Sequence, residues 1–210
     1  LDEISGQPVP PGEKGVLAVV PPLPPGCLST IWNQDERFVS TYFKGFRDRL
    51  VYSSFDWGIQ DQDGYYFILG RTDDVINVAG HRLGTREIEE AASGHSAIAE
   101  VAVVGVHDNL KGQVPMAFAV LKNPDQLQTD ADRERLAREV IQQVGHELGA
   151  IAHPSQVHFV NQLPKTRSGK VLRRSIQAIA EGRDPGDLTT LDDPSGIEQI
   201  RQVLGQTASA

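Results

Sequence analysis

The run Val101-Ala102-Val103-Val104-Gly105-Val106, followed after eight residues by Pro115-Met116-Ala117-Phe118-Ala119-Val120-Leu121, decides the fold class. Both runs are short and almost wholly apolar, which is typical of buried β-strands. Around them, apolar residues recur at helical spacing at about 85–92, 132–148 and 170–180. Strands interleaved with amphipathic helices, in no strict alternation, predict an α+β domain built on a mixed sheet.

The first 70 residues are mostly β by the same reasoning. Short apolar runs rich in strand-forming residues predict strands at 16–20, 27–32, 51–53, 58–60 and 65–69, around a short helix at about 35–43. Further along, we expect a strand at 157–160 and a helix at 197–204. The pattern changes after residue 72, so we predict a β-rich segment over residues 1–72 and an α+β domain over 73–210.

The composition disfavours several classes of partner. The chain has 210 residues with 20 Lys or Arg and 28 Asp or Glu, a formal net charge of −8. This charge opposes binding to polyanions and anionic membranes, so we expect no nucleic acid and no membrane as partner. A single cysteine, Cys27, indicates a reducing compartment, and we expect a cytoplasmic protein. Leu1 at the start and Met116 as the only methionine predict that the sequence is a piece of a longer protein.

One segment is strongly basic in an otherwise acidic chain. Residues 165–174 contain five basic residues and no acid. A lysine at the start of the helix expected from Lys170 would oppose the helix dipole, at a cost of up to ~1 kcal/mol, unless an anion is bound there. We therefore predict an anion site at Lys170, with a solvated basic loop as the alternative. The segment is not a P-loop, because Pro164 replaces the first glycine and Val171 the Ser or Thr.

Residues 70–84 lie where the composition changes. Their Gly and Asp residues favour either a swivel followed by a loop with exposed backbone, or a plain connecting turn.

The six histidines show no spacing typical of a metal site, so we expect no metal bound by side chains. The chain also lacks a nucleophile elbow and a Cys-based catalytic context, so a hydrolase triad has no support.

These motifs, in their order and spacing, resemble the C-terminal third of AMP-forming short-chain acyl-CoA synthetases. The residues that carry the resemblance are Asp56, 65–85, Glu87-Ile88-Glu89, Lys111-Gly112-Gln113 and 164–170. The family shares its fold with firefly luciferase and peptide-synthetase adenylation domains. Within it, residues 55–58, 68–76 and 181–190 are more similar to the propionyl-CoA synthetases than to the acetyl-CoA synthetases. The resemblance implies a ligase that uses ATP, Mg²⁺ and coenzyme A to convert propionate, or a similar short-chain carboxylate, into acyl-CoA, AMP and pyrophosphate through an acyl-adenylate.

The resemblance also assigns roles to residues. Lys170 would be the catalytic cation of adenylation. Asp56 would accept hydrogen bonds from the ribose hydroxyls, and Arg71 would lie near ribose and phosphate. Asp73 would be the hinge about which the small domain rotates between the two steps.

The same rotation would bring a second set of residues to coenzyme A. The backbone around Gly80 and His81 would line the pantetheine tunnel, and Arg82 would meet phosphate. Gly145 stands where some relatives carry an arginine for the 3′-phosphate of coenzyme A, with His146 or Lys111 as substitutes.

The resemblance further implies partners. Residues 1–72 would be the tail of an N-terminal adenylation domain whose phosphate loop and acyl pocket are not in this sequence, so this piece would be inactive alone. A protein lysine acyltransferase and a sirtuin-type deacylase would act on Lys170. The alternative without catalysis is a free-standing nucleotide- or anion-binding module built on residues 165–174.

Overall fold

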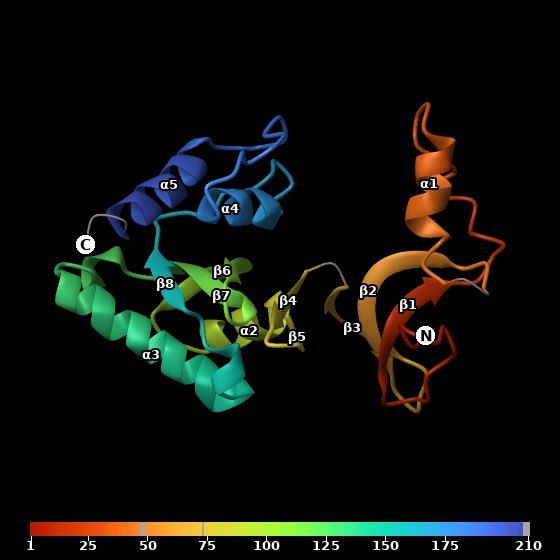
Figure 1. The fold of residues 1–210 in the computed structure, drawn as a ribbon, viewed down its shortest axis with the longest axis horizontal. Helices are drawn as coiled ribbons and strands as arrows, with labels where there is room; N and C mark the ends of the chain where they lie inside the picture. The colour runs from red at the N-terminus through yellow and green to blue at the C-terminus, as the bar shows by residue number, and fades with distance from the viewer. Residues whose placement is uncertain (47–48, 73, 208–210) are drawn as a thin grey trace. The chain divides into compact units, whose positions relative to one another are not determined.

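The computed structural model describes residues 1–46, 49–72 and 74–207, except for the side chains of the last two. It divides into two compact units, Leu1–Asp74 and Val75–Ala210. Figure 1 shows the helices and strands of each unit. The predicted hinge, Asp73, lies outside the described residues.

The first unit is a three-stranded antiparallel sheet with one helix. Its elements are β1 (Lys14–Val19), α1 (Asp35–Tyr42), β2 (Tyr52–Gln60) and β3 (Tyr66–Arg71), with the strands in the order β1-β2-β3. Aromatic rings hold the helix to the sheet: Tyr42 of α1 stacks on Tyr52 of β2 with ring centroids 4.9 Å apart. Two expectations were wrong here. Residues 27–32 form no strand, because no described strand pairs with them, and the predicted strands 51–53 and 58–60 are one continuous strand, β2.

The second unit contains one mixed sheet and four α-helices among its described residues. Its elements are β4 (Val75–Val78), β5 (His81–Gly84), α2 (Thr85–Ser93), β6 (Ile98–Asp108), β7 (Gly112–Leu121), α3 (Asp130–Leu148), β8 (Gln156–Phe159), α4 (Arg173–Ala180) and α5 (Ser195–Thr207), with single 3-10 turns at Pro124–Gln126 and Ala150–Ala152. The sheet order is β5-β4-β7-β6, and β8 runs parallel to β7. The α+β fold expected from the sequence is confirmed.

Alternation along the two central strands creates two cores. In β6, Val103 faces one core, and Ala102 and Val104 face the other. The first core is closed by α2 and α3, and the second by α4 and α5, so helices cover both faces of the sheet (Figure 1). The strand period of two explains this arrangement, since neighbouring side chains leave a strand on opposite sides. The two apolar runs at 101–106 and 115–121 are therefore the centre of the unit.

Two local features differ from the sequence-based expectation. Residues 75–84, expected as a swivel and loop or a connecting turn, form the hairpin β4–β5. The helix expected from Lys170 begins only at Arg173, because Val171 forms a β-bridge with Lys165 and the backbone N–H of Leu172 donates to Pro164.

Candidate functional site

Lys170 lies in a closed loop and not at a helix start. The backbone N–H of Thr166 donates to the carbonyl of Lys170 at 2.8 Å, and the N–H of Lys170 donates to Thr166 Oγ1 at 3.1 Å. Gly169 completes the turn at φ +82°, a conformation that glycine adopts without strain. The helix-dipole argument made from the sequence therefore does not apply to Lys170. Its backbone is fixed instead by hydrogen bonds across the loop.

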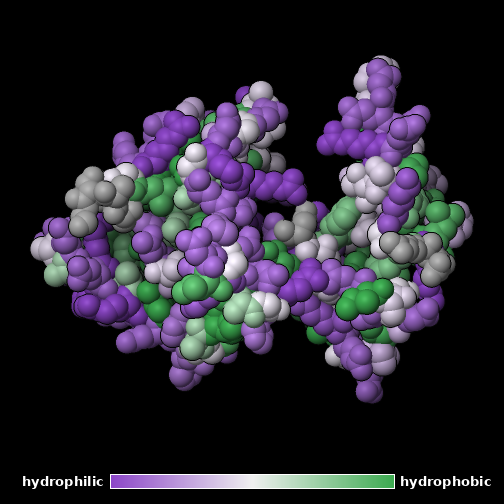
Figure 2. Space-filling view, in the orientation of Figure 1, coloured by the Kyte–Doolittle hydropathy of each residue, from purple (hydrophilic) through white to green (hydrophobic). Residues whose placement is uncertain are grey.

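The charged groups around this loop differ in how far they are neutralised. Lys165 Nζ lies 2.6 Å from Glu100 Oε2, and Arg173 forms a two-pronged ion pair with Glu89. The ammonium of Lys170 is exposed and has no hydrogen-bond or ion-pair partner among the described residues. The side chain of Arg167 in the same loop is likewise exposed, without a partner among the described residues. An uncompensated cation on a backbone held by hydrogen bonds can meet an anion from solvent or from another domain. Hydrophilic side chains gather over α4, the helix that follows this loop (Figure 2).

The second candidate surface is the tip of the β4–β5 hairpin. Ala79 and Gly80 form the turn with φ +49° and +87°, the signature of a type I′ turn. A Cβ added at Gly80 would meet no atom within 4 Å, so its surroundings are open on the protein side. His81 and Arg82 follow the turn with exposed side chains. The exposed backbone at Gly80 fits the approach of an extended ligand.

The hairpin is attached to the β6–β7 turn, which carries the predicted motif Lys111-Gly112-Gln113. The backbone N–H of Ala79 donates to the carbonyl of Lys111 at 2.7 Å. The side chain of Gln113 accepts from the N–H of Asn77 at 2.9 Å. The structure thus brings two separate sequence motifs together. The role of this motif is to hold the hairpin in place.

In the first unit, Asp56 and Arg71 face each other on neighbouring strands. They are Cα partners in the β2–β3 ladder, and Arg71 Nη1 lies 3.9 Å from Asp56 Oδ1. Arg71 also donates to the carbonyl of Ser54 at 3.2 Å and covers the Phe55 ring. Both charged side chains are partly exposed. A β-bulge at residues 54 and 55, with Phe55 at φ +60°, places them at an irregular point of the sheet.

The position that the resemblance left open, Gly145, is covered by another residue. A Cβ built on Gly145 would lie 1.8 Å from His153 Nε2. The imidazole of His153 therefore occupies the space in which a side chain at 145 would begin. That His146 or Lys111 takes the place of the arginine for the 3′-phosphate stays a prediction.

The sequence analysis placed Glu89 in the motif Glu87-Ile88-Glu89 but assigned it no role; it is the buried acid of the second unit within the described residues. It accepts from Arg173 and from the backbone N–H of Val103. A signal was available, because Glu89 lies one turn after Thr85 and beside Ile88 on the apolar face of its helix. A charged residue on a buried helix face is rare unless it is paired.

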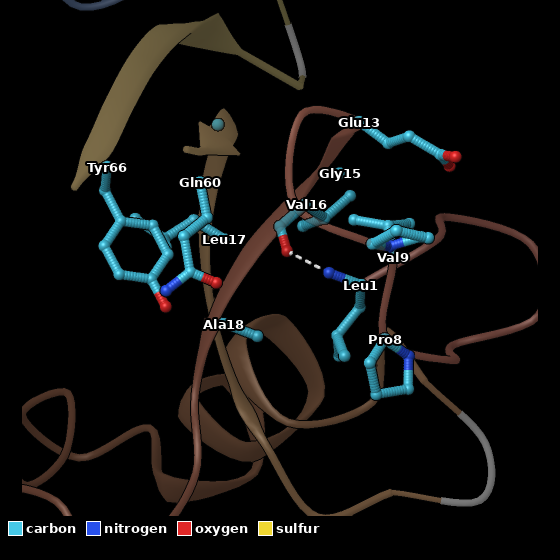
Figure 3. A pocket seen from close by; sticks show the side chains of 12 residues that line it. Leu1, Pro8, Val9, Glu13, Gly15, Val16, Leu17, Ala18, Gln60 and Tyr66 are labelled. Atoms are coloured by element: carbon cyan, nitrogen blue, oxygen red, sulfur yellow. Dashed lines mark hydrogen bonds between the residues drawn. The ribbon is translucent and has the colours of Figure 1, made fainter. Parts of the chain in front are cut away.

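A surface pocket of the first unit lies at none of these places. It is lined by the N-terminal segment and by β1 to β3, including Val9, Leu17 and Tyr66, with the Leu1 amino group bonded to the Val16 carbonyl at 2.9 Å (Figure 3). None of the predicted site residues lines it.

Two further facts concern the described residues only. None of their helices has the length and apolarity to cross a membrane. They hold no group of three or more His, Cys, Asp or Glu side chains able to bind a metal ion.

Comparison with known proteins places this geometry in a family. Residues 87–170 match the AMP-binding enzyme C-terminal domain. The chain is 59% identical over 97% of its length to propionate–CoA ligase of Escherichia coli, covering 32% of that protein. It is 48% identical over 96% of its length to acetyl-coenzyme A synthetase of Pyrobaculum arsenaticum, covering 29%. The chain thus spans about a third of the length of the curated relatives it matches.

Solved structures agree. The anthranilate CoA ligase AuaEII in complex with anthranoyl-AMP aligns with a TM-score of 0.69 and 30% identity, over 86% of this chain and 33% of the other. The ATP-bound RpMatB-BxBclM chimera B1 aligns with a TM-score of 0.71 and 29% identity, over 85% of this chain and 34% of the other. The resemblance inferred from the motifs is confirmed. Residues 87–170 match the AMP-binding enzyme C-terminal domain, and along nearly its whole length the chain is similar to about a third of a propionate–CoA ligase.

Proposed function

We propose that this chain is the C-terminal part of an AMP-forming acyl-CoA ligase that acts on propionate or a similar short-chain carboxylate. The full-length enzyme would join the carboxylate to AMP, releasing pyrophosphate, and then transfer the acyl group to the thiol of coenzyme A. The observation that carries the proposal is the exposed, unpartnered ammonium of Lys170 on a loop held by hydrogen bonds. The identity to propionate–CoA ligases, higher than to the acetyl-coenzyme A synthetases, supports propionate as substrate.

Lys170 suits the adenylation step for an electrostatic reason. Attack of a carboxylate on the α-phosphate of ATP builds negative charge on the phosphoryl oxygens and on the departing pyrophosphate. A fixed cation aimed at that charge typically contributes a factor of about 10²–10³ to the rate. Lys165 and Arg173 serve this role less well, because Glu100 and Glu89 already neutralise them.

The remaining predicted residues suit binding more than chemistry. Asp56 offers carboxylate oxygens to the two ribose hydroxyls, and Arg71 beside it offers a planar cation to the same nucleotide. The exposed turn at Gly80 suits the pantetheine chain of coenzyme A, and the exposed side chain of Arg82 beside it suits a phosphate. Asp73 is proposed as the hinge between the units. Rotation about it would exchange Lys170 for the hairpin between the two steps.

Mg²⁺ enters the proposal as a companion of the nucleotide. The described residues provide no cluster of ligands for it. Its chemistry, when bound, is to neutralise the ATP phosphates. Donors for it would come from those phosphates and from the adenylation domain.

Reversible acylation of Lys170 would switch the first step off. Acylation removes the positive charge and leaves an amide that cannot stabilise developing phosphate charge. Exposure of the Lys170 side chain supports access by a protein lysine acyltransferase and by a sirtuin-type deacylase. Mass spectrometry after incubation with such an acyltransferase and acyl-CoA tests it, and an unmodified Lys170 would refute it.

The decisive experiment separates the two half-reactions in the full-length protein. Pyrophosphate exchange with acetate, propionate and butyrate reports adenylation and its substrate. We expect Lys170→Ala to lower exchange by about 10²–10³-fold. Thioester formation from preformed acyl-adenylate should stay close to the wild-type rate, since Lys170 is withdrawn in that step.

The matched control is Arg167→Ala, which removes one positive charge from the same loop. We expect Arg167→Ala to change the rate of pyrophosphate exchange by less than about tenfold. The reason is that salt screens the interaction of an exposed charge with a phosphate that it does not contact. Equal loss of both half-reactions in Lys170→Ala would contradict the role of Lys170. Absence of exchange with any of the three carboxylates in the wild type would contradict the proposed activity itself.

A further inference from the structure

Glu89 is a buried carboxylate whose hydrogen bonds all run to the element that follows Lys170 and to the central sheet. Its side chain is 11% exposed. Arg173 donates from Nε to Glu89 Oε1 at 2.9 Å and from Nη2 to Oε2 at 2.7 Å. The backbone N–H of Val103 in β6 donates to Oε1 at 2.9 Å. One carboxylate thus connects three elements, α2, β6 and the start of α4.

The start of α4 depends on this pair. Arg173 is the first residue of the helix, where a positive charge is unfavourable, and Leu172 before it supplies no side-chain cap. The pairing with Glu89 compensates the unfavourable charge of Arg173 at this position. A buried ion pair adds little net stability over apolar packing, so its value lies in fixing a geometry. The geometry it fixes begins three residues after Lys170.

The contact belongs to a row along the free edge of β6. Arg173, Gln177 and Glu181 follow one another at intervals of four, on one side of α4 and its C-terminal end. Gln177 Nε2 donates to the carbonyl of Gly105 at 2.7 Å, and Glu181 Oε1 accepts from the N–H of His107 at 3.1 Å. Since β6 is a terminal strand in its sheet order, Glu89, Gln177 and Glu181 satisfy backbone groups on its edge that no described strand pairs. Glu89 and Arg173 are the charged end of this row and the part nearest to Lys170 in sequence.

We propose that Glu89, through Arg173, is a positioning residue for Lys170 in the adenylation step. This inference rests on the proposed function. The pair fixes the α4 end of the Lys170 loop, and the hydrogen bond from Leu172 to Pro164 closes the base of the loop. Loss of the pair lets α4 and the loop shift together against β6. A displacement of about 1 Å at a reacting centre typically costs about 10²-fold in rate.

The test is Glu89→Gln in the full-length protein. Glutamine keeps the volume of the side chain but has only one acceptor oxygen. Its amide N–H₂ would face a donor, either Arg173 or Val103, so the two-pronged contact with Arg173 is lost. We expect pyrophosphate exchange to fall by about 10²-fold. Thioester formation from preformed acyl-adenylate should stay within about threefold of the wild type, because that step does not use Lys170. A general loss of folding would lower both half-reactions together.

Glu90→Gln is the matched control. Glu90 is the next residue on the same helix and pairs with Arg86 at 2.7 Å on the exposed side, away from the Lys170 loop. It should leave both half-reactions unchanged. A Glu89→Gln enzyme with wild-type exchange activity, or one that loses both half-reactions equally, overturns the positioning role.

Amide hydrogen exchange gives a readout that does not depend on activity. In Glu89→Gln, peptides covering residues 164–173 should exchange at least about tenfold faster, whereas in Glu90→Gln they should match the wild type. Unchanged exchange in Glu89→Gln overturns the positioning role even in a protein that shows no ligase activity. Loss of activity already in the wild type refutes the proposed function and leaves this measurement to decide the structural role of Glu89.

Discussion

Substitution of Gly80 separates two reasons for a glycine at the hairpin tip. The resemblance requires glycine because a side chain would narrow the coenzyme A tunnel. The structure supplies another reason, since Gly80 has φ +87° and a Cβ built there would meet no protein atom within 4 Å. Gly80→Ala therefore carries only backbone strain, about 1–2 kcal/mol for a left-handed L-residue. With a urea m-value of about 1–3 kcal/mol/M, the unfolding midpoint should fall by roughly 0.3–2 M.

The two units can be followed by different signals in the same titration. Both tryptophans, Trp32 and Trp57, lie in the first unit, whereas α2 to α5 dominate the helical circular dichroism from the second. Gly80→Ala should lower the midpoint measured by circular dichroism and leave the fluorescence midpoint unchanged. Ala79→Gly should raise the circular dichroism midpoint, because Ala79 already bears strain at φ +49°.

Gly80→Asn distinguishes strain from tunnel width. Asparagine tolerates the left-handed region far better than alanine, so its midpoint should lie between those of Gly80→Ala and the wild type. It nevertheless introduces a side chain larger than that of alanine. In the full-length protein we expect Gly80→Asn to impair thioester formation from acyl-adenylate while pyrophosphate exchange is retained. Equal midpoints for the alanine and asparagine variants would refute the strain argument, and unimpaired thioester formation would refute the tunnel.

Two further predictions concern the second unit. Phe118→Ala removes a fully buried ring of the second core and should lower the free energy of unfolding by about 3–5 kcal/mol. Leu110→Ser, at a 96% exposed site, should change it by less than about 0.5 kcal/mol. Urea unfolding followed by circular dichroism measures both. Burial lowers the pKa of His158 from its ordinary value near 6.5, so the unfolded chain binds the proton more readily and stability should decline as pH falls below about 6.5. His158→Asn should flatten this decline between pH 7.5 and 5.5, and an unchanged slope would exclude His158 as its source.

Elements with a strong apolar period were predictable from the sequence. The helix expected at 132–148 is α3 from Asp130, where Thr129 and Asp132 form a capping box. The two central strands were found because their apolar runs are buried on both faces. Short elements were not. The strands β4 and β5 have four residues each, and their turn, Ala79-Gly80, lacks the Asn or Asp that signals a type I′ hairpin.

The start of α4 shows why the site was harder to predict than the fold. The apolar residues Leu172 and Ile176 have the same spacing whether the helix begins at 170 or at 173, so periodicity cannot locate its first residue. Tertiary contacts set the boundary. They are the β-bridge between Lys165 and Val171 and the pairing of Arg173 with Glu89, which lies 84 residues earlier in the sequence. Lys170 was identified from motif order, whereas the reason for its exposure appears only in three dimensions.

Under the proposed function, the attachment of both candidate surfaces to one sheet supports the proposed rotation of the whole unit between the two steps. The Lys170 loop is tied near Val103 through Arg173 and Glu89, and the hairpin is tied at Gly112, the partner of Asp108. Val103 and Asp108 are five residue steps apart along β6, roughly 17 Å at about 3.3 Å per residue. Local loop movement could not withdraw one surface and present the other without breaking these hydrogen bonds. A rigid turn about a hinge moves both at once and breaks none of them, so the ties that hold Lys170 in place also favour the hinge mechanism.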